Sequence, residues 1–190
     1  MASPSKPLVL ASASPQRKRL LREAGIRFVV RPSNIPEKEH GANGRVLALQ
    51  LAREKARAVA ERFPDRWVLG ADTTVACKGE LLAKPKDSKD ALRILRLLNG
   101  SWQRVYTGVA LVNRKAGKEF SGVAMSRVKA RKMPEDWLKR YSHKHHDKAG
   151  GYSIQHTDDP FVEKFEGPLD NVIGLPVELV RRLLSKAGIC

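Results

Sequence analysis

The stretch from Pro7 to Gly25, PLVLASASPQRKRLLREAG, constrains the fold most, because a strand, a tight connection and a helix follow one another directly. The apolar run at 8–10 is too short for a helix and predicts a buried strand. Ser14 and Pro15 stand in the order of a helix N-cap and a first helical residue, and Gly25 is a typical helix stop. The stretch therefore predicts a strand that leads into a helix over residues 15–24, as in α/β proteins.

Arg17 has an unusual position in this predicted helix. It lies on the same face as Leu20 and Leu21, which should be buried, and a cation in the first turn opposes the helix dipole. The position is explained if an anion binds at the helix start, held by backbone N–H groups, serine hydroxyls and the guanidinium. The alternative is a solvated basic helix, because other basic residues surround Arg17.

The rest of the chain alternates predicted helices and strands. Helices are predicted over 45–63, 87–98, 134–142 and from residue 177 onward, and a loop over 33–44. Strands are predicted over 27–31, over 67–70 with an extended continuation through 73–77, and as a hairpin over 105–112 and 122–131. This order predicts an α/β fold with a mixed sheet flanked by helices, and the length suits a single domain spanning residues 1–190.

Composition narrows the class of protein. A hydrophobic content of 42% and a charged content of 29% are typical of globular proteins, and no apolar run is long enough to span a membrane. The first residues lack the apolar segment of a signal peptide, so we expect a cytoplasmic protein without membrane contact. The formal net charge of +16 indicates attraction to polyanions such as nucleotides or nucleic acid; the alternative is a general bias without a specific partner.

Three further positions suggest chemistry. Lys55 lies on the small-residue stripe of its helix, where it either extends to solvent or pairs with a phosphate or carboxylate. Asp72 ends the apolar strand VLGAD, the place where α/β sheets put ligands, and its alternative is a loop aspartate bonded to local N–H groups. Lys84 precedes Pro85, which holds its backbone extended and suits a point charge on phosphate, although Lys-Pro is also common in surface loops.

A histidine-rich segment raises the question of a metal site. His143, His145, His146 and Asp147 cluster in the sequence, but their spacing fits neither HExxH nor a zinc finger. A solvated loop is the better interpretation. The two cysteines, Cys77 and Cys190, form no metal or redox motif.

Eight stretches, taken together and in order, resemble the Maf family of nucleoside triphosphate pyrophosphatases over nearly the whole chain. They are LASASPQR at 10–17, SNIPE ending in Glu37, LAREKARAV at 51–59, GADTTV at 70–75, AKPKD at 83–87, VYTGVAL at 105–111, DKAGGYSIQ at 147–155 and FEGPLDNVIGLP at 165–176. Each stretch is weak alone, but the ordered set is highly specific.

The resemblance implies a twisted sheet in an elongated, two-lobed architecture of the Maf and inosine triphosphatase type, with a central cleft and commonly a homodimer. It implies hydrolysis of a nucleoside triphosphate to the monophosphate and pyrophosphate with Mg or Mn. The implied substrate-binding residues are Ser12, Ser14, Gln16, Arg17 and Gln155. The implied metal ligands are Glu37 and Asp72, and the implied catalytic residues are Asp72, Lys84 and Lys55.

The resemblance defines the base specificity less clearly than it defines the reaction. The segment DKAGGYSIQ is similar to the subgroup that acts on dTTP and UTP, but Gln16 replaces a usual arginine and Gln103 a frequent histidine. CTP and methylated guanine nucleotides therefore stay open. The alternative function is a basic nucleic-acid-binding or cell-division regulatory protein without strong catalysis. Carboxylates beside lysines favour metal-assisted hydrolysis, and we expect nucleic-acid binding to be weak.

Overall fold

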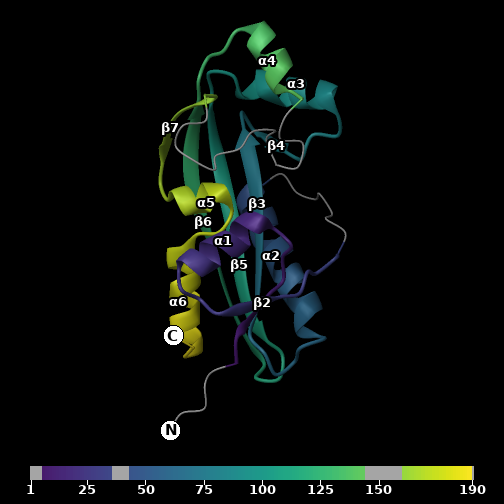
Figure 1. The fold of residues 1–190 in the computed structure, drawn as a ribbon, viewed down its shortest axis with the longest axis vertical. Helices are drawn as coiled ribbons and strands as arrows, with labels where there is room; N and C mark the ends of the chain where they lie inside the picture. Colours follow the sequence, from purple (N-terminus) through teal and green to yellow (C-terminus); the bar gives the residue numbers. More distant parts are fainter. Residues whose placement is uncertain (1–5, 36–42, 144–159, 190) are drawn as a thin grey trace.

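The computed structural model describes residues 6–35, 43–143 and 160–189, which form a mixed sheet flanked by helices (Figure 1). The strands are β1 (Leu8–Leu10), β2 (Phe28–Val30), β3 (Val68–Cys77), β4 (Glu80–Leu82), β5 (Trp102–Asn113), β6 (Lys118–Ala130) and β7 (Val162–Glu166). They lie in the order β2-β1-β3-β5-β6-β7, with β4 paired to β3. β1 is parallel to β2 and β3, and the other pairs are antiparallel, so the predicted mixed sheet is confirmed.

All helices of the described ranges except α5 begin and end close to where the sequence predicts. They are α1 (Pro15–Glu23), α2 (Gly44–Ala60), α3 (Ser88–Leu98), α4 (Glu135–Tyr141), α5 (Leu169–Ile173) and α6 (Val177–Ala187). In α1 the Ser14 hydroxyl accepts the backbone N–H of Arg17 at 3.4 Å, and Gly25 follows the helix with φ of 71°. No helix in these ranges has the length and apolar character needed to cross a membrane.

The central strands are longer than predicted. β5 and β6 have 12 and 13 residues and pair continuously from Trp102 opposite Lys129 to Asn113 opposite Lys118. Their polar ends lack the apolar pattern on which the prediction rests, yet backbone pairing extends through them. These strands run along most of the long axis of the molecule (Figure 1).

Three short elements are absent from the sequence prediction: β4, β7 and α5. Each has three to five residues, which is too few for a periodic pattern to be recognised. The two strands depend on backbone bonds to their longer neighbours, β3 and β6. Their existence is therefore decided by pairing partners elsewhere in the chain.

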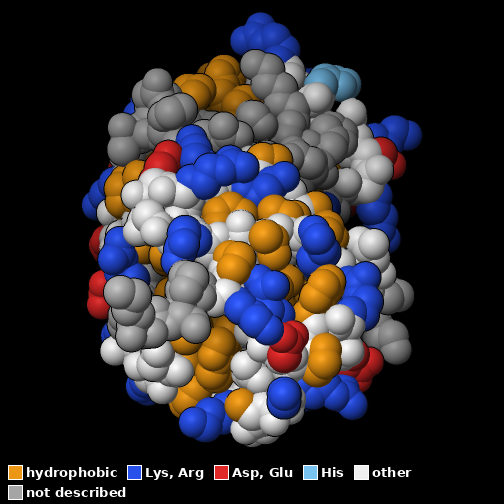
Figure 2. Space-filling model, turned by 60° about the horizontal axis from the view of Figure 1, so that its bottom comes forward, with side chains coloured by type: hydrophobic (Ala, Val, Ile, Leu, Met, Phe, Trp, Pro, Cys, Tyr) orange, Lys and Arg blue, Asp and Glu red, His pale blue; other side chains and the backbone are white. Residues whose placement is uncertain are grey.

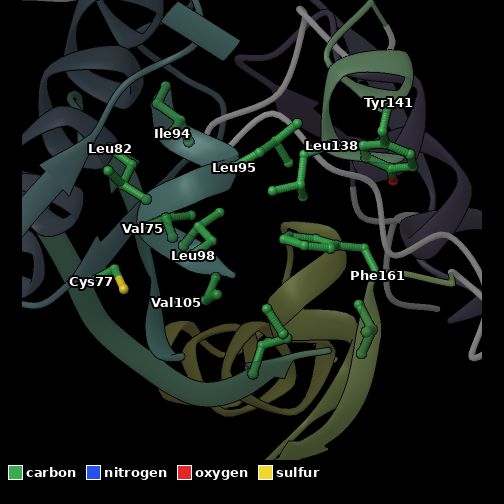
Figure 3. Close-up of a cluster of buried hydrophobic side chains, with 13 residues drawn as sticks. Val75, Cys77, Leu82, Ile94, Leu95, Leu98, Val105, Leu138, Tyr141 and Phe161 are labelled. Carbon is green, nitrogen blue, oxygen red and sulfur yellow. The ribbon is translucent and has the colours of Figure 1, made fainter. Parts of the chain in front are cut away.

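Buried side chains form clusters at the two ends of the long strands. At one end, α3 and α4 cover the sheet, and Figure 3 shows Ile94, Leu95 and Leu98 lying close to Val75 and Val105 of the strands. At the other end, α1 and α6 cover one face of the sheet and α2 covers the opposite face. The molecule thus has hydrophobic cores at both ends, separated along β3 and β5.

Helix α2 packs unusually close to the sheet because glycines and alanines meet. A Cβ atom placed on Gly108 would overlap the backbone carbonyl of Ala48, and one on Gly70 would lie 2.7 Å from the backbone nitrogen of Ala56. Larger side chains at these glycines would push the helix away from β3 and β5.

We therefore predict that Gly108→Ala lowers the free energy of unfolding by ~1–3 kcal/mol or more, the usual cost of overpacking. Gly117→Ala is the control, because a Cβ there has no atom within 4 Å and only backbone strain at its φ of 61° is introduced. Thermal and denaturant unfolding measure both variants. A Gly108→Ala protein as stable as wild type would contradict the close packing.

Candidate functional site

The site forms at a gap in the pairing of β3. β1 pairs with β3 only as far as Leu69, and β4 takes over at Val75. Among the described residues, no strand pairs with residues 70–74 on this edge. Since β1 ends here and α1 begins, the gap opens at the carboxyl end of parallel strands, where α/β sheets place ligands.

Lys55 and Asp72 form a buried ion pair at this gap. The Lys55 Nζ atom lies 2.5 Å from Asp72 Oδ1, and each residue is only 7% exposed. Of the alternatives for Lys55, extension to solvent is therefore wrong and pairing with a carboxylate is confirmed. The close packing of α2 on Gly70 brings the lysine within reach of the strand. Each charge compensates the other, so the pair tolerates a burial that neither would tolerate alone.

Arg17 is held in place by three neutral oxygens. Its Nη1 donates to the Ser12 hydroxyl at 3.2 Å, and its Nε donates to the carbonyl of Gly174 at 3.0 Å. Its Nη2 donates to the Thr73 hydroxyl at 3.3 Å. These bonds fix the plane of the guanidinium, and a guanidinium held in one plane suits the bidentate binding of an anion. The inward direction predicted for Arg17 is confirmed.

A chain of hydrogen bonds through two threonine hydroxyls connects Arg17 to α5. Thr107 donates to the carbonyl of Asn171 at 3.0 Å, and the Thr73 and Thr107 hydroxyl oxygens lie 3.0 Å apart. Because Thr107 has a single hydroxyl hydrogen, Thr73 donates to Thr107 and accepts from Arg17. These hydrogen bonds thus connect residues of α1, β3, β5 and α5 at the site.

The serines and Gln16 surround the start of α1. The Ser12 hydroxyl also accepts the backbone N–H of Ser14 at 3.3 Å, and the Ser14 hydroxyl donates to Gln16 Oε1 at 3.1 Å. Ser12, Ser14, Gln16 and Arg17 are therefore grouped within one turn, as the sequence predicts. Gln16 brings a neutral amide to this turn in place of a second cation.

The remaining predicted residues are less connected to this group. Lys84 follows β4, and its side chain is exposed. Glu37 and Gln155 lie outside the described residues. His143 Nδ1 lies 3.1 Å from the Ser88 hydroxyl, while His145, His146 and Asp147 also lie outside the described ranges.

The donors at the gap are compatible with a hard divalent cation. Within the described ranges, no three His, Cys, Asp or Glu side chains gather as a metal-binding group. Mg²⁺, however, is commonly held by one or two carboxylates, with substrate phosphates and water as its other ligands. Asp72 at the open edge of β3 fits such a shared site, whereas a site built from protein ligands alone does not fit these ranges.

Sequence reasoning missed Thr73, Thr107, Asn171 and Gly174. Gly174 ends α5 with φ of 124°, a conformation that favours glycine and directs its carbonyl to Arg17. The stretches GADTTV, VYTGVAL and FEGPLDNVIGLP contain all four residues, but only the fold shows that Thr73 and Gly174 contact Arg17. The sequence Ile-Gly-Leu-Pro was the only local indication of a special backbone conformation at Gly174.

The described surface carries excess positive charge. On the face shown in Figure 2, Lys and Arg side chains are widely spread and Asp and Glu side chains are few. This agrees with the formal charge of +16 and with its dispersal along the chain. Such a surface attracts anionic ligands over distances of about 8–10 Å at physiological salt.

We predict that Lys55→Met and Asp72→Asn each lower the free energy of unfolding by ~3–5 kcal/mol, because each removes one partner of a buried ion pair. The double variant should lose less than the sum of the two. The control is Arg57 with Glu119, a more exposed pair at 2.7 Å, for which Arg57→Met and Glu119→Gln should cost no more than ~1 kcal/mol. Urea unfolding of the single and double variants of both ion pairs measures the interaction energy within each pair. Additive losses of stability at Lys55 and Asp72 would show that the two residues do not interact.

Comparison with known proteins identifies the family. The family model described as Maf-like protein matches residues 7–187. A dTTP/UTP pyrophosphatase of Elusimicrobium minutum is 48% identical over 95% of this chain and 98% of its own length. Those of Bdellovibrio bacteriovorus and Myxococcus xanthus are 43% and 44% identical over 94% and 96% of this chain and 97% and 93% of their own lengths.

A solved HAM1 protein from Coxiella burnetii superposes with a TM-score of 0.44 at 13% identity, covering 67% of this chain and 74% of that one, which is too distant a likeness to carry an argument. The family assignment rests on the match over residues 7–187 and on relatives more than 40% identical over nearly their whole length. The chain belongs to the family of Maf-like proteins.

Proposed function

We propose that this chain is a nucleoside triphosphate pyrophosphatase that cleaves dTTP and UTP to the monophosphate and pyrophosphate. The observation that carries the proposal is the convergence of a fixed cation, Arg17, and the buried Lys55–Asp72 pair at the open edge of β3. The names of the relatives described above support the choice of substrate.

The start of α1 supplies the phosphate-binding part of the proposed site. Its first turn contains no acidic residue, and the positive end of the helix dipole there favours an anion. The Ser12 hydroxyl and the Arg17 guanidinium add donors from the adjacent side. A triphosphate bound there exchanges water for charge-assisted hydrogen bonds, which are stronger than neutral ones.

Asp72 is the proposed base. A water oxygen attacks the α-phosphorus, the bond to the bridging oxygen breaks, pyrophosphate leaves with the electron pair, and the water proton passes to Asp72. Lys55 positions the carboxylate and adds positive charge where phosphate charge develops. The described residues hold no serine or cysteine paired with a histidine at this gap, and the proposed route needs no covalent intermediate.

A divalent cation, Mg or Mn, completes the proposal. Asp72 is the ligand that the described residues offer, and Glu37 is the second ligand that the family resemblance implies. When bound, such an ion neutralises phosphate oxygens and lowers the pKa of bound water. Lys84 is proposed to contact the triphosphate, and Gln155 to contact the nucleotide.

The cellular compartment and the oligomeric state of the protein are also part of the proposal. Because dTTP and UTP are cytoplasmic metabolites, we propose that the protein acts in the cytoplasm. A homodimer is the assembly that the family resemblance implies, and sedimentation of the purified protein measures it.

Asp72→Asn should reduce kcat for pyrophosphate release from dTTP and UTP by at least ~10²–10⁴-fold, the usual loss on removing a general base. Asp136→Asn, the same change at an exposed residue of α4, is the control and should keep full activity. A panel with CTP and methylated guanine nucleotides, with Mg, Mn or EDTA, tests the substrate and the metal together. Near-normal turnover by folded Asp72→Asn would remove this residue from the mechanism.

Arg17→Lys should keep the charge but lose the bonds to Gly174 and Thr73, so kcat/KM should fall by ~10–100-fold, as expected for hydrogen bonds to a charged group. Arg22→Lys in the same helix, where Arg22 is exposed, is the matched control. If the two variants retain equal activity, the fixed guanidinium is not a phosphate ligand.

A further inference from the structure

Part of a sheet face is not covered by any helix of the described ranges. Helix α2 covers this face only from Gly44 onward, where a Cβ would lie 3.1 Å from the Thr74 hydroxyl and 3.2 Å from the Tyr106 ring. Beyond the start of α2, the same face holds a groove of about 300 Å³ whose lining includes Lys78, Trp102, Arg104, Tyr106 and Arg127. Among the described residues that line the groove there is no Asp or Glu.

Strand register places aromatic and basic side chains in adjacent rows on this face. Directly opposed residues of antiparallel strands share a face, and successive members of a row are two residues apart. Arg104 is opposite Arg127, and Trp102 is opposite Lys129, which in turn is opposite Lys164. We call this surface the basic platform: Trp102, Arg104, Tyr106, Arg127, Lys129 and Lys164.

The side chains of the basic platform are already arranged for stacking. The Arg127 guanidinium lies 4.4 Å from the centroid of the Trp102 ring, and the Lys164 ammonium lies 5.3 Å from it. Glu166 pairs with Arg127 at 3.0 Å, which orients the guanidinium from its edge. A guanidinium held over an indole presents a flat, cationic surface on which a further planar ring can stack.

The charge of the platform is not balanced by its neighbours. Arg104 is exposed and has no hydrogen bond or ion pair with another described residue, and Lys129 donates to the carbonyl of Gly100 at 2.6 Å. Among the described residues of the platform and their strand partners, four cations therefore face one carboxylate, Glu166. The neighbouring Met125, opposite Tyr106 and 43% exposed, adds an apolar contact.

We propose that the basic platform binds single-stranded nucleic acid. Unpaired bases stack on Tyr106 and on the Arg127 guanidinium, while Arg104, Lys129 and Lys164 contact the phosphates. A sheet face of this kind reads bases only when they are unpaired, so a duplex should bind more weakly. The platform is separate from the hydrolytic site, because the start of α2 lies over Thr74 between them. The proposal is therefore independent of nucleotide hydrolysis.

The test is fluorescence anisotropy with labelled oligo-dT and oligo-U of about 20 nucleotides, longer than the usual footprint of a single binding fold. A duplex of the same length is the comparison. The wild type should bind the single strands more tightly than the duplex at about 50 mM salt and lose affinity as salt rises to about 200 mM. No binding of single strands at the lower salt overturns the proposal.

Matched charge reversals separate the platform from the general positive charge. Arg104→Glu should weaken binding about tenfold and lower the slope of log affinity against log salt by about 0.7 for each lost phosphate contact. Arg182→Glu makes the same charge change at an exposed position of α6, on the covered opposite face, and should weaken binding less than about twofold. Equal losses in both variants would overturn a specific platform.

A stacking variant and two further readouts complete the test. Tyr106→Ala should weaken single-strand binding about tenfold, in the range of one lost base stack, with folding checked by melting temperature. Pyrophosphate release from dTTP should be unchanged in Arg104→Glu, since this residue lies outside the hydrolytic site. If Arg104→Glu instead converts a dimer into a monomer in sedimentation while no variant binds oligonucleotide, the platform is a self-association surface and the proposal fails.

Discussion

The buried ion pair between Lys55 and Asp72 is the interaction on which the site depends. It exists because α2 lies close enough to β3 for a lysine side chain to reach a strand carboxylate at 2.5 Å. That distance in turn requires the absence of side chains at Gly70 and Gly108, where helix and sheet backbones nearly touch. A buried pair contributes little net stability but strongly penalises the loss of either partner, so it specifies an arrangement.

The gap in the pairing of β3 converts this arrangement into an accessible site. β1 and β4 each pair with part of the same edge and leave residues 70–74 between them. Arg17 enters the gap from α1 and is fixed by oxygens of Ser12, Thr73 and Gly174. A guanidinium fixed in this way presents its donors in one orientation, as the binding of a polyphosphate requires.

The two ends of the sheet differ in which of their faces are covered by helices. Near β1, both faces are covered by helices and form hydrophobic cores. Near the other ends of β5 and β6, one face is covered by α3 and α4, and the opposite face carries the basic platform. The formal charge of +16 exceeds what one triphosphate site needs, and the platform is a place where part of that charge is concentrated beside aromatic rings.

The sequence by itself determined the local features: the Ser14 cap, the Pro15 helix start, the turn at Gly25, the inward faces of Arg17 and Lys55, and the strand that contains Asp72. These follow from backbone preferences and periodicity, which act between residues near in sequence. Tertiary structure decided the partners of those residues, the short elements β4, β7 and α5, and the part of the sheet that no helix of the described ranges covers. Such features depend on atoms far apart in the chain, like those of positions 17, 73 and 174, which meet only when the sheet and its helices pack.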